Sequence, residues 1–265
     1  MSTPKTASIW DSFNAKAKEQ ILSTVKGRYF PEIWYVLENW LQTVKHREAL
    51  EVGYGIGMVG EALAKSGWAV TMTDPSVAAM NTFKERFAKM QLKAAFAVSE
   101  GGKLPFATGS QEVVVAINSL EFAPDRRALL TEIARVLKPS GRAAIVVFNS
   151  YGPWGLPLIS QQLRLPPRQQ AGRLFTKREF TSLLTACRLE PTQVLERAYY
   201  LPFAMPGNVR IKLPLPGAFV ALIKGSTGSR NRRSHKPNQP ESAPSAQTKK
   251  VETNAIKRQS RPRLP

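Results

Sequence analysis

The stretch that decides the fold is residues 48–57, EALEVGYGIG. Glu48–Gly53 predicts a short strand, and the glycines at positions 53, 55 and 57 predict a turn into the next helix. Glycine has no side chain, so a ligand can lie against bare backbone, facing the amides that open the helix. The stretch therefore predicts a ligand site at a strand-to-helix turn.

Strands and helices alternate after this turn. The predicted helices are Val59–Ser66, Val77–Met90, Arg126–Leu137 and Thr176–Cys187. The further predicted strands are Ala69–Asp74, Lys93–Val98, Val113–Asn118, Arg142–Phe148, Gln193–Tyr200 and Gly217–Ile223. This order predicts an α/β fold of the Rossmann-like type, with a seven-stranded, mostly parallel sheet and helices on both faces. The final two strands are expected to be antiparallel neighbours at one edge.

The chain has 265 residues and a net charge of +19, with a single cysteine, so no internal disulfide can form. We expect an N-terminal lid or helical segment over 1–47, an α/β domain over 48–225 with a cap insertion at 151–175, and a basic tail over 226–265 that its composition predicts to be disordered. The tail favours an anionic partner, either a lipid surface or nucleic acid; its alternative role is solubility. No signal peptide or transmembrane segment is evident, which favours a cytoplasmic protein, with a peripheral membrane location as the alternative.

Two cofactor classes fit the glycine turn. Gly55–Gly60 matches the dinucleotide fingerprint G-x-G-x-x-G, and Asp74, at the tip of the second strand, could accept hydrogen bonds from ribose hydroxyls. Glu51 precedes the glycines, where its carboxylate could reach a cationic amino group but would repel a pyrophosphate. Glu100 after the third strand and Asn118 after the fourth add polar groups at the same edge. Together these residues favour a cofactor with an amino group over a dinucleotide.

At this point the sequence resembles a known family, the class I S-adenosylmethionine-dependent methyltransferases of type 11, which includes ubiquinone and menaquinone methyltransferases. The resemblance spans about Trp10 to Lys224. Its strongest pieces are LEVGYGIG (50–57), VTMTDPS (70–76), KLPF (103–106), VVVAINSLEF (113–122) and ARVLKPSGRAAIVVF (134–148). The resemblance implies S-adenosyl-L-methionine as the cofactor and a small methyl acceptor that is apolar, or lipid- or quinone-like.

The resemblance also implies roles for individual residues. Glu51 would approach the methionine ammonium, Asp74 the ribose, Glu100 the adenine amino group and Asn118 the methionine end. The remaining expected cofactor contacts are Gly53, Gly55, Gly57, Pro75 and Gly101. For Glu100 and Asn118, the alternative interpretation is that they are ordinary loop residues.

Catalytic and acceptor residues are harder to assign. Glu121 and Asp125 follow the fourth strand and are the best-placed candidates for a base, although a solvated loop residue and a helix N-cap are the simpler interpretation. We identify no metal-ligating cluster. The aromatic residues expected to form the acceptor pocket are Trp10, Phe13, Tyr151, Trp154 and Phe203.

The sequence departs from the family in two places. Gln111-Glu112 replaces a usual Phe-Asp pair, and Ala17-Lys18 replaces a usual Tyr-Asp pair in the lid. Three alternative functions stay open. The net charge of +19 motivates a nucleic-acid or ribosome-associated methyltransferase, Ala17-Lys18 keeps open a non-catalytic S-adenosylmethionine-binding protein, and the Gly55–Gly60 fingerprint keeps open an NAD-dependent oxidoreductase.

Overall fold

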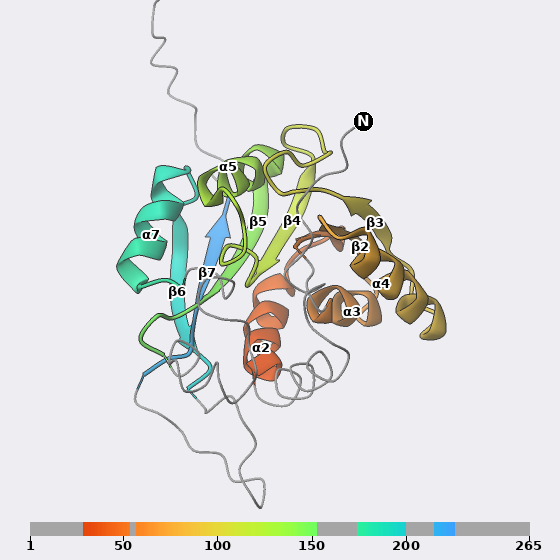
Figure 1. Cartoon of the computed structure of the whole chain (residues 1–265), viewed down its shortest axis with the longest axis horizontal. Helices are drawn as coiled ribbons and strands as arrows, with labels where there is room; N and C mark the ends of the chain where they lie inside the picture. The colour runs from red at the N-terminus through yellow and green to blue at the C-terminus, as the bar shows by residue number, and fades with distance from the viewer. Residues whose placement is uncertain (1–28, 54–56, 153–173, 200–214, 226–265) are drawn as a thin grey trace, which may run out of the picture. The chain divides into compact units, whose positions relative to one another are not determined.

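The computed structural model describes residues 29–53, 57–152, 174–199 and 215–225. Their strands form one sheet in the order β3-β2-β1-β4-β5-β7-β6 (Figure 1). The strands are β1 (Glu48–Val52), β2 (Ala69–Asp74), β3 (Ala95–Val98), β4 (Gln111–Ile117), β5 (Leu137–Phe148), β6 (Pro191–Arg197) and β7 (Ala218–Lys224).

Strand pairing confirms the predicted mostly parallel sheet. β1 lies between β2 and β4 and runs parallel to both, and β4 runs parallel to β5. β7, the last strand in sequence, is antiparallel to both of its neighbours, β5 and β6. The two C-terminal strands are therefore adjacent, as predicted, with β6 at the edge.

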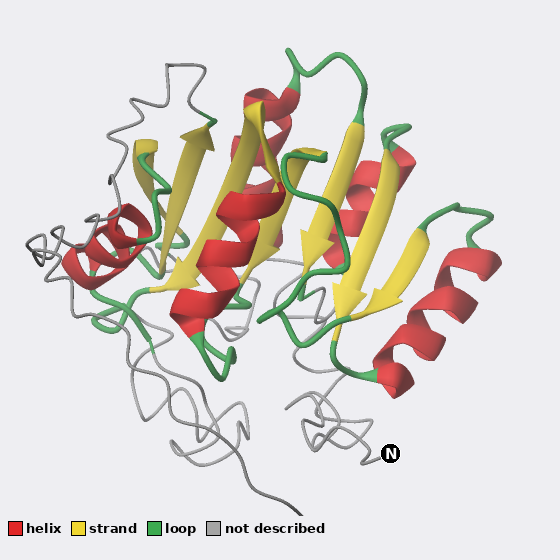
Figure 2. Ribbon diagram, turned by 90° about the horizontal axis from the view of Figure 1, so that it is seen from above, coloured by secondary structure: helices red, strands yellow, loops and turns green. Residues whose placement is uncertain are grey.

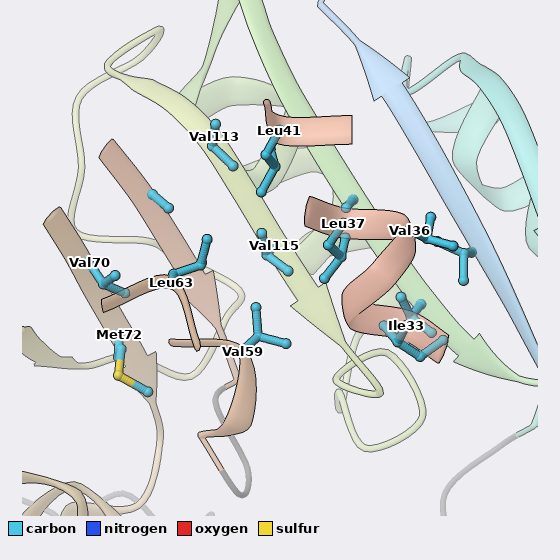
Figure 3. Close-up of a cluster of buried hydrophobic side chains, with 14 of the residues drawn as sticks. Ile33, Val36, Leu37, Leu41, Val59, Leu63, Val70, Met72, Val113 and Val115 are labelled. Atoms are coloured by element: carbon cyan, nitrogen blue, oxygen red, sulfur yellow. The ribbon is translucent and has the colours of Figure 1, made fainter. Parts of the chain in front are cut away.

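Helices cover both faces of the sheet (Figure 2). Helices α2 (Phe30–Leu41), α3 (Met58–Lys65) and α4 (Val77–Lys89) contribute to one apolar cluster, and α5 (Arg126–Val136) and α7 (Lys177–Ala186) contribute to the other. Val113 and Val115 of β4 belong to the first cluster (Figure 3), whereas Val114 between them belongs to the second. This alternation explains why β4 reads as a continuous apolar run: both of its faces are buried.

The N-terminal region contributes a helix to this core. Ile33 and Leu37 of α2 are fully buried and belong to the same apolar cluster as Val115 and Val59 (Figure 3). The sequence predicted a lid or helical segment over 1–47. The described part of that segment includes α2, which packs in the first apolar cluster, and the domain boundaries stay predictions.

Some predicted element boundaries were wrong by one or more residues. The largest shift is at β5, which begins at Leu137 and not at Arg142, so the segment Lys138–Gly141 belongs to the irregular start of a strand. The pairing with β4 shifts register there, between Gln111↔Leu137 and Val113↔Arg142. Pro139 has no amide hydrogen to donate to a ladder, so such a residue is found only at edges, strand starts or bulges.

A capping box begins α7. The Thr176 side chain accepts from the Glu179 amide at 3.1 Å, and the Glu179 carboxylate accepts from the Thr176 amide at 3.0 Å. The predicted tail over 226–265 and most of the predicted cap insertion lie outside the described residues. Within the described ranges, none of the helices has the length and apolar character needed to cross a membrane.

Candidate functional site

The polar residues singled out from the sequence meet at one edge of the sheet. The strand order reverses between β1 and β4, and in open α/β sheets ligands bind at such a switch point, beyond the carboxyl ends of the strands. β1 ends in Glu51 and Val52, β2 ends in Asp74, and Asn118 directly follows β4. Because these three strands are parallel, Glu51, Asp74 and Asn118 lie at the same end of the sheet, where the carboxyl ends of the strands meet.

The glycine turn after β1 has little space for side chains. Gly53 has φ +68°, and a Cβ there would lie 2.7 Å from the Ser119 Oγ atom. Gly57, the N-cap of α3, has φ +63°, and a Cβ there would lie 2.3 Å from the Phe83 ring. Both positions need glycine for conformation and for space. Gly55 lies outside the described residues.

Glu51 is a buried acid beneath this turn. Its side chain is 2% exposed, and Oε2 accepts a hydrogen bond from the Gly60 amide at 2.9 Å. Burial raises its pKa to about 8; the Gly60 hydrogen bond opposes that rise, and the neighbouring Asp74 charge adds to it. The ionised form is disfavoured in the ligand-free protein, and a cation placed beside it would favour that form.

Asp74 is anchored at the tip of β2. It is 4% exposed, and its Oδ1 atom accepts from the Ser76 amide at 3.0 Å. Ser76 in turn caps α4, because its Oγ atom accepts from the Ala79 amide at 3.0 Å. Local hydrogen bonds therefore fix the direction of the Asp74 carboxylate.

The loop after β3 carries Glu100 and Gly101. Glu100 is exposed, whereas Gly101 is buried with φ +79°. The Ser99 hydroxyl organises the loop: it donates to the Lys103 carbonyl at 3.1 Å and accepts from the Gly101 amide at 3.3 Å. The adenine contact expected of Glu100 stays a prediction, as does that of Pro75 beside Asp74.

A buried hydrogen-bond chain follows β4. The Tyr29 hydroxyl donates to Asn118 Oδ1 at 2.9 Å, and Asn118 Nδ2 donates to Glu121 Oε1 at 3.0 Å. The Phe148 amide at the end of β5 donates to the same Glu121 atom at 2.6 Å. Tyr29 was not among the site residues predicted from the sequence; the signal that could have found it was the amphipathic run FPEIWYVLENWL that follows it.

Glu121 and Asp125 have different environments. The simpler interpretation of Glu121 as a solvated loop residue was wrong, because its side chain is 1% exposed and burial raises its pKa to about 7. Asp125 is the N-cap of α5, as that interpretation expected, and accepts from the Ala128 amide at 2.9 Å.

Of the five aromatic residues predicted for the acceptor pocket, the structure describes only Tyr151. It follows β5 and is 68% exposed. Trp10, Phe13, Trp154 and Phe203 lie outside the described residues. The acceptor pocket therefore stays a prediction.

Comparison with protein families matches residues 50–145 to a family described as the methyltransferase domain. A protein of Mycobacterium tuberculosis without an assigned function is 28% identical over 131 residues, covering 47% of this chain and 48% of the relative. The ubiquinone biosynthesis O-methyltransferase of Coxiella burnetii is 28% identical over 107 residues, covering 40% of this chain and 46% of the relative. The chain thus spans about half the length of the curated relatives it matches.

Solved structures share the fold. A SAM-dependent methyltransferase from Methanosarcina mazei aligns with a TM-score of 0.53 and 24% identity, covering 72% of this chain and 97% of that one. A Thermotoga maritima structure, described as a SAM-dependent methyltransferase and possible histamine N-methyltransferase, gives a TM-score of 0.61 at 16% identity. It covers 82% of this chain and 99% of that one.

Proposed function

We propose, from the premise that this chain carries a class I S-adenosylmethionine-dependent methyltransferase domain, that it transfers the cofactor's methyl group to a small apolar acceptor. The observation that carries this proposal is the pair of buried carboxyls, Glu51 and Asp74, at the ends of adjacent parallel strands beside the glycine turn. Such a pair suits a ligand with a cationic amino group and a ribose. An ionised Glu51 would repel the pyrophosphate of a dinucleotide.

In this proposal, the residues along the edge divide the cofactor between them. Asp74 accepts from the ribose hydroxyls, and Glu51 interacts with the methionine ammonium. Because Glu51 is buried, its attraction for a cation is screened less than it would be at the surface. Gly53 and Gly57 let the turn between these two contacts pack closely against Ser119 and Phe83.

Bound S-adenosylmethionine would supply a methyl group made electrophilic by the adjacent sulfonium. The chain's own contribution is then to hold the acceptor in line with that group and to exclude water, which can supply much of the rate acceleration. Glu51 would hold the methionine ammonium and Asp74 the ribose, the two parts of the cofactor that are bonded to the sulfonium through carbon chains.

An apolar acceptor is supported by the side chains that follow β4 and β5. Phe122 is 45% exposed and Tyr151 is 68% exposed, and both follow strands on the β4–β5 side of the site, away from Asp74. A relative named as a ubiquinone biosynthesis O-methyltransferase also points to a quinone- or lipid-like acceptor. The chain's net charge of +19 would suit an acceptor or carrier with an anionic portion.

Calorimetry and methyl labelling test this proposal together. We expect S-adenosylhomocysteine to bind the purified full chain with a micromolar dissociation constant, and NADH not to bind. Incubation with labelled S-adenosylmethionine and fractionated cell extract should place label in the lipid or small-molecule pool. Binding of NADH alone would contradict the cofactor assignment, and label confined to RNA would favour a nucleic-acid acceptor.

Replacing Asp74 with asparagine should weaken S-adenosylhomocysteine binding without disturbing the loop. Asparagine can still accept from the Ser76 amide, but one carboxylate oxygen becomes a donor that cannot receive a ribose hydroxyl. The loss of a hydrogen bond to a charged group predicts an affinity about thirtyfold lower by calorimetry.

Asp125→Asn is the matched control. It makes the same chemical change at another residue whose Oδ1 accepts a local amide, and asparagine caps helices as well as aspartate does. We expect its affinity and its rate of methyl transfer to equal those of the wild type. A thirtyfold loss in both variants, or in neither, would contradict the role proposed for Asp74.

A further inference from the structure

We propose that Glu121 is a positioning residue, which holds Asn118 and, through it, Tyr29 in the arrangement that receives the amino-acid end of the cofactor. This inference rests on the proposed function, and it concerns residues distinct from those that contact the ribose. Glu121 is not assigned contact with the cofactor itself; it acts through the Asn118 side chain.

The hydrogen bonds of Asn118 leave its amide one orientation. Its Oδ1 atom accepts from the Tyr29 hydroxyl and its Nδ2 atom donates to Glu121 Oε1. The backbone of Asn118 lies in the left-handed region at φ +51°, which residues other than glycine rarely adopt. Asparagine adopts this region more readily than most residues, and here it does so at the carboxyl end of a central strand, where ligands bind in such sheets.

Neighbouring contacts connect the hydrogen-bonded residues Tyr29, Asn118 and Glu121 to the glycine turn. The Ser119 hydroxyl donates to the Val52 carbonyl at 2.7 Å and to the Gly53 carbonyl at 3.1 Å. On the other side, Glu121 Oε1 accepts from the Phe148 amide. Hydrogen bonds of the segment from Asn118 to Glu121 thus connect the end of β4 to the ends of β1 and β5, beside the glycine turn.

The position of Asn118 in the sheet indicates which part of the cofactor it faces. Asp74 ends β2, on one side of β1, whereas Asn118 follows β4, on the other side. If Asp74 holds the ribose, the rest of the molecule extends across the glycine turn toward β4. Asn118 and Tyr29 then belong to the methionine end, and the adenosine lies away from them.

Burying the polar groups of Tyr29 and Glu121 has a free-energy cost that a purely structural role would not explain. Tyr29 is 3% exposed and Glu121 is 1% exposed, and within the described part of the chain Glu121 Oε2 has no hydrogen-bond partner. A well-packed apolar side chain is often at least as stable as a buried, incompletely satisfied acid, so an acid in this position calls for another explanation. Burial and the nearby Glu121 raise the pKa of Tyr29 well above its usual value, so its hydroxyl stays protonated and donates.

The test compares S-adenosylhomocysteine with adenosine, which lacks the amino-acid end. Glu121→Ala should weaken S-adenosylhomocysteine binding about tenfold, the effect of about one lost hydrogen-bonding arrangement, and leave adenosine binding within about twofold. Glu121→Gln should stay close to wild type with both ligands, because its side-chain oxygen can accept from Asn118 and Phe148. Tyr29→Phe, which lacks only the hydroxyl, should weaken S-adenosylhomocysteine binding about threefold and spare adenosine.

Tyr35→Phe is the matched control for Tyr29→Phe. It removes the same hydroxyl from a side chain of α2 that is 67% exposed, and should change neither affinity. Three results would each overturn the inference. Glu121→Ala could lose affinity for both ligands equally, or Glu121→Ala or Tyr29→Phe could bind S-adenosylhomocysteine as tightly as the wild type. Glu121→Gln could also bind it as weakly as Glu121→Ala does. Should Glu121→Ala fail to fold, Tyr29→Phe decides alone by its S-adenosylhomocysteine-to-adenosine ratio. Wild-type protein that binds adenosine and S-adenosylhomocysteine with equal affinity would also overturn the inference, whereas wild type that binds neither would overturn the proposed function itself.

Discussion

Glu51→Gln is expected to weaken S-adenosylhomocysteine binding about a hundredfold while making the ligand-free protein more stable at pH 8. The loss of affinity follows from removing a buried negative charge beside the expected position of the ammonium group. The gain in stability has a separate cause. Glutamine matches the shape of glutamate and can still accept from the Gly60 amide, but it has no charge to bury.

The pH dependence of this stability difference has a definite sign. The pKa of Glu51 is raised from an ordinary value of 4.5 to about 8 in the folded protein, chiefly by burial, so the folded state holds this proton more tightly than the unfolded state. As pH rises from the pKa of Glu51 in the unfolded chain toward its pKa in the folded protein, ionisation of the unfolded chain lowers the stability of the wild type. The advantage of Glu51→Gln should therefore be absent near pH 4, grow through neutral pH and level off above pH 8.

Urea unfolding at a series of pH values measures this difference. We expect the free energy of unfolding of Glu51→Gln to exceed that of the wild type by about 2 kcal/mol at pH 8. This is less than the full free-energy equivalent of the shift in pKa. Glu85→Gln on α4 makes the same substitution at an exposed position and should leave both stability and affinity unchanged. If Glu51→Gln is less stable than the wild type at pH 8, the buried acid stabilises the fold. The idea that Glu51 lowers stability while it strengthens cofactor binding is then wrong. Glu121, whose pKa is raised to about 7, is present in all three proteins and cancels in the comparison.

Prediction from the sequence succeeded where the signal is local. Asp74 ends an alternating strand and precedes a helix N-cap, and the glycine turn follows an apolar strand directly, so a short window contains each pattern. The mostly parallel sheet could be predicted because strands that alternate with helices favour parallel pairing through helical crossovers. The environment of Glu121 could not be predicted, because its burial depends on Tyr29 and on the end of β5, which are distant in sequence.

The same distinction explains the error at β5 and the packing of α2 that the sequence did not indicate. The segment Lys138–Gly141 has the composition of a helix stop, and only pairing with β4 makes it the irregular start of a strand. Helix α2 has a clear apolar stripe, but nothing within that window indicates that it packs against β4 rather than covering the site as a lid. Tertiary packing decides such cases.

Gly57→Ala is expected to destabilise the protein by about 3 kcal/mol, from two separable causes. The left-handed conformation at φ +63° costs an alanine about 1 kcal/mol. The remainder comes from the Phe83 ring, which a new Cβ would approach to 2.3 Å. Phe83 is 4% exposed and packs in the first apolar cluster, so its ring has little space to move aside, and overpacking typically costs about 1–3 kcal/mol.

Two comparisons separate these causes. Gly109 has nearly the same conformation, φ +65°, and a Cβ there would meet nothing within 4 Å, so Gly109→Ala should show the backbone cost alone, about 1 kcal/mol. In a Phe83→Leu background the ring is absent, and Gly57→Ala should again cost only about 1 kcal/mol. Urea unfolding of the four proteins in the Gly57–Phe83 cycle measures the coupling between the two positions.

The size of that coupling decides why glycine is needed where the turn enters α3. If Gly57→Ala costs no more than Gly109→Ala, conformation alone requires the glycine, and the packing of Phe83 has no part in shaping the turn. If the coupling is about 2 kcal/mol, as expected for a fixed ring, the core beneath the turn holds the first amides of α3 in place. S-adenosylhomocysteine affinity should then fall in Gly57→Ala, because the clash with the Phe83 ring displaces the first amides of α3, and recover in the double variant, where that clash is absent.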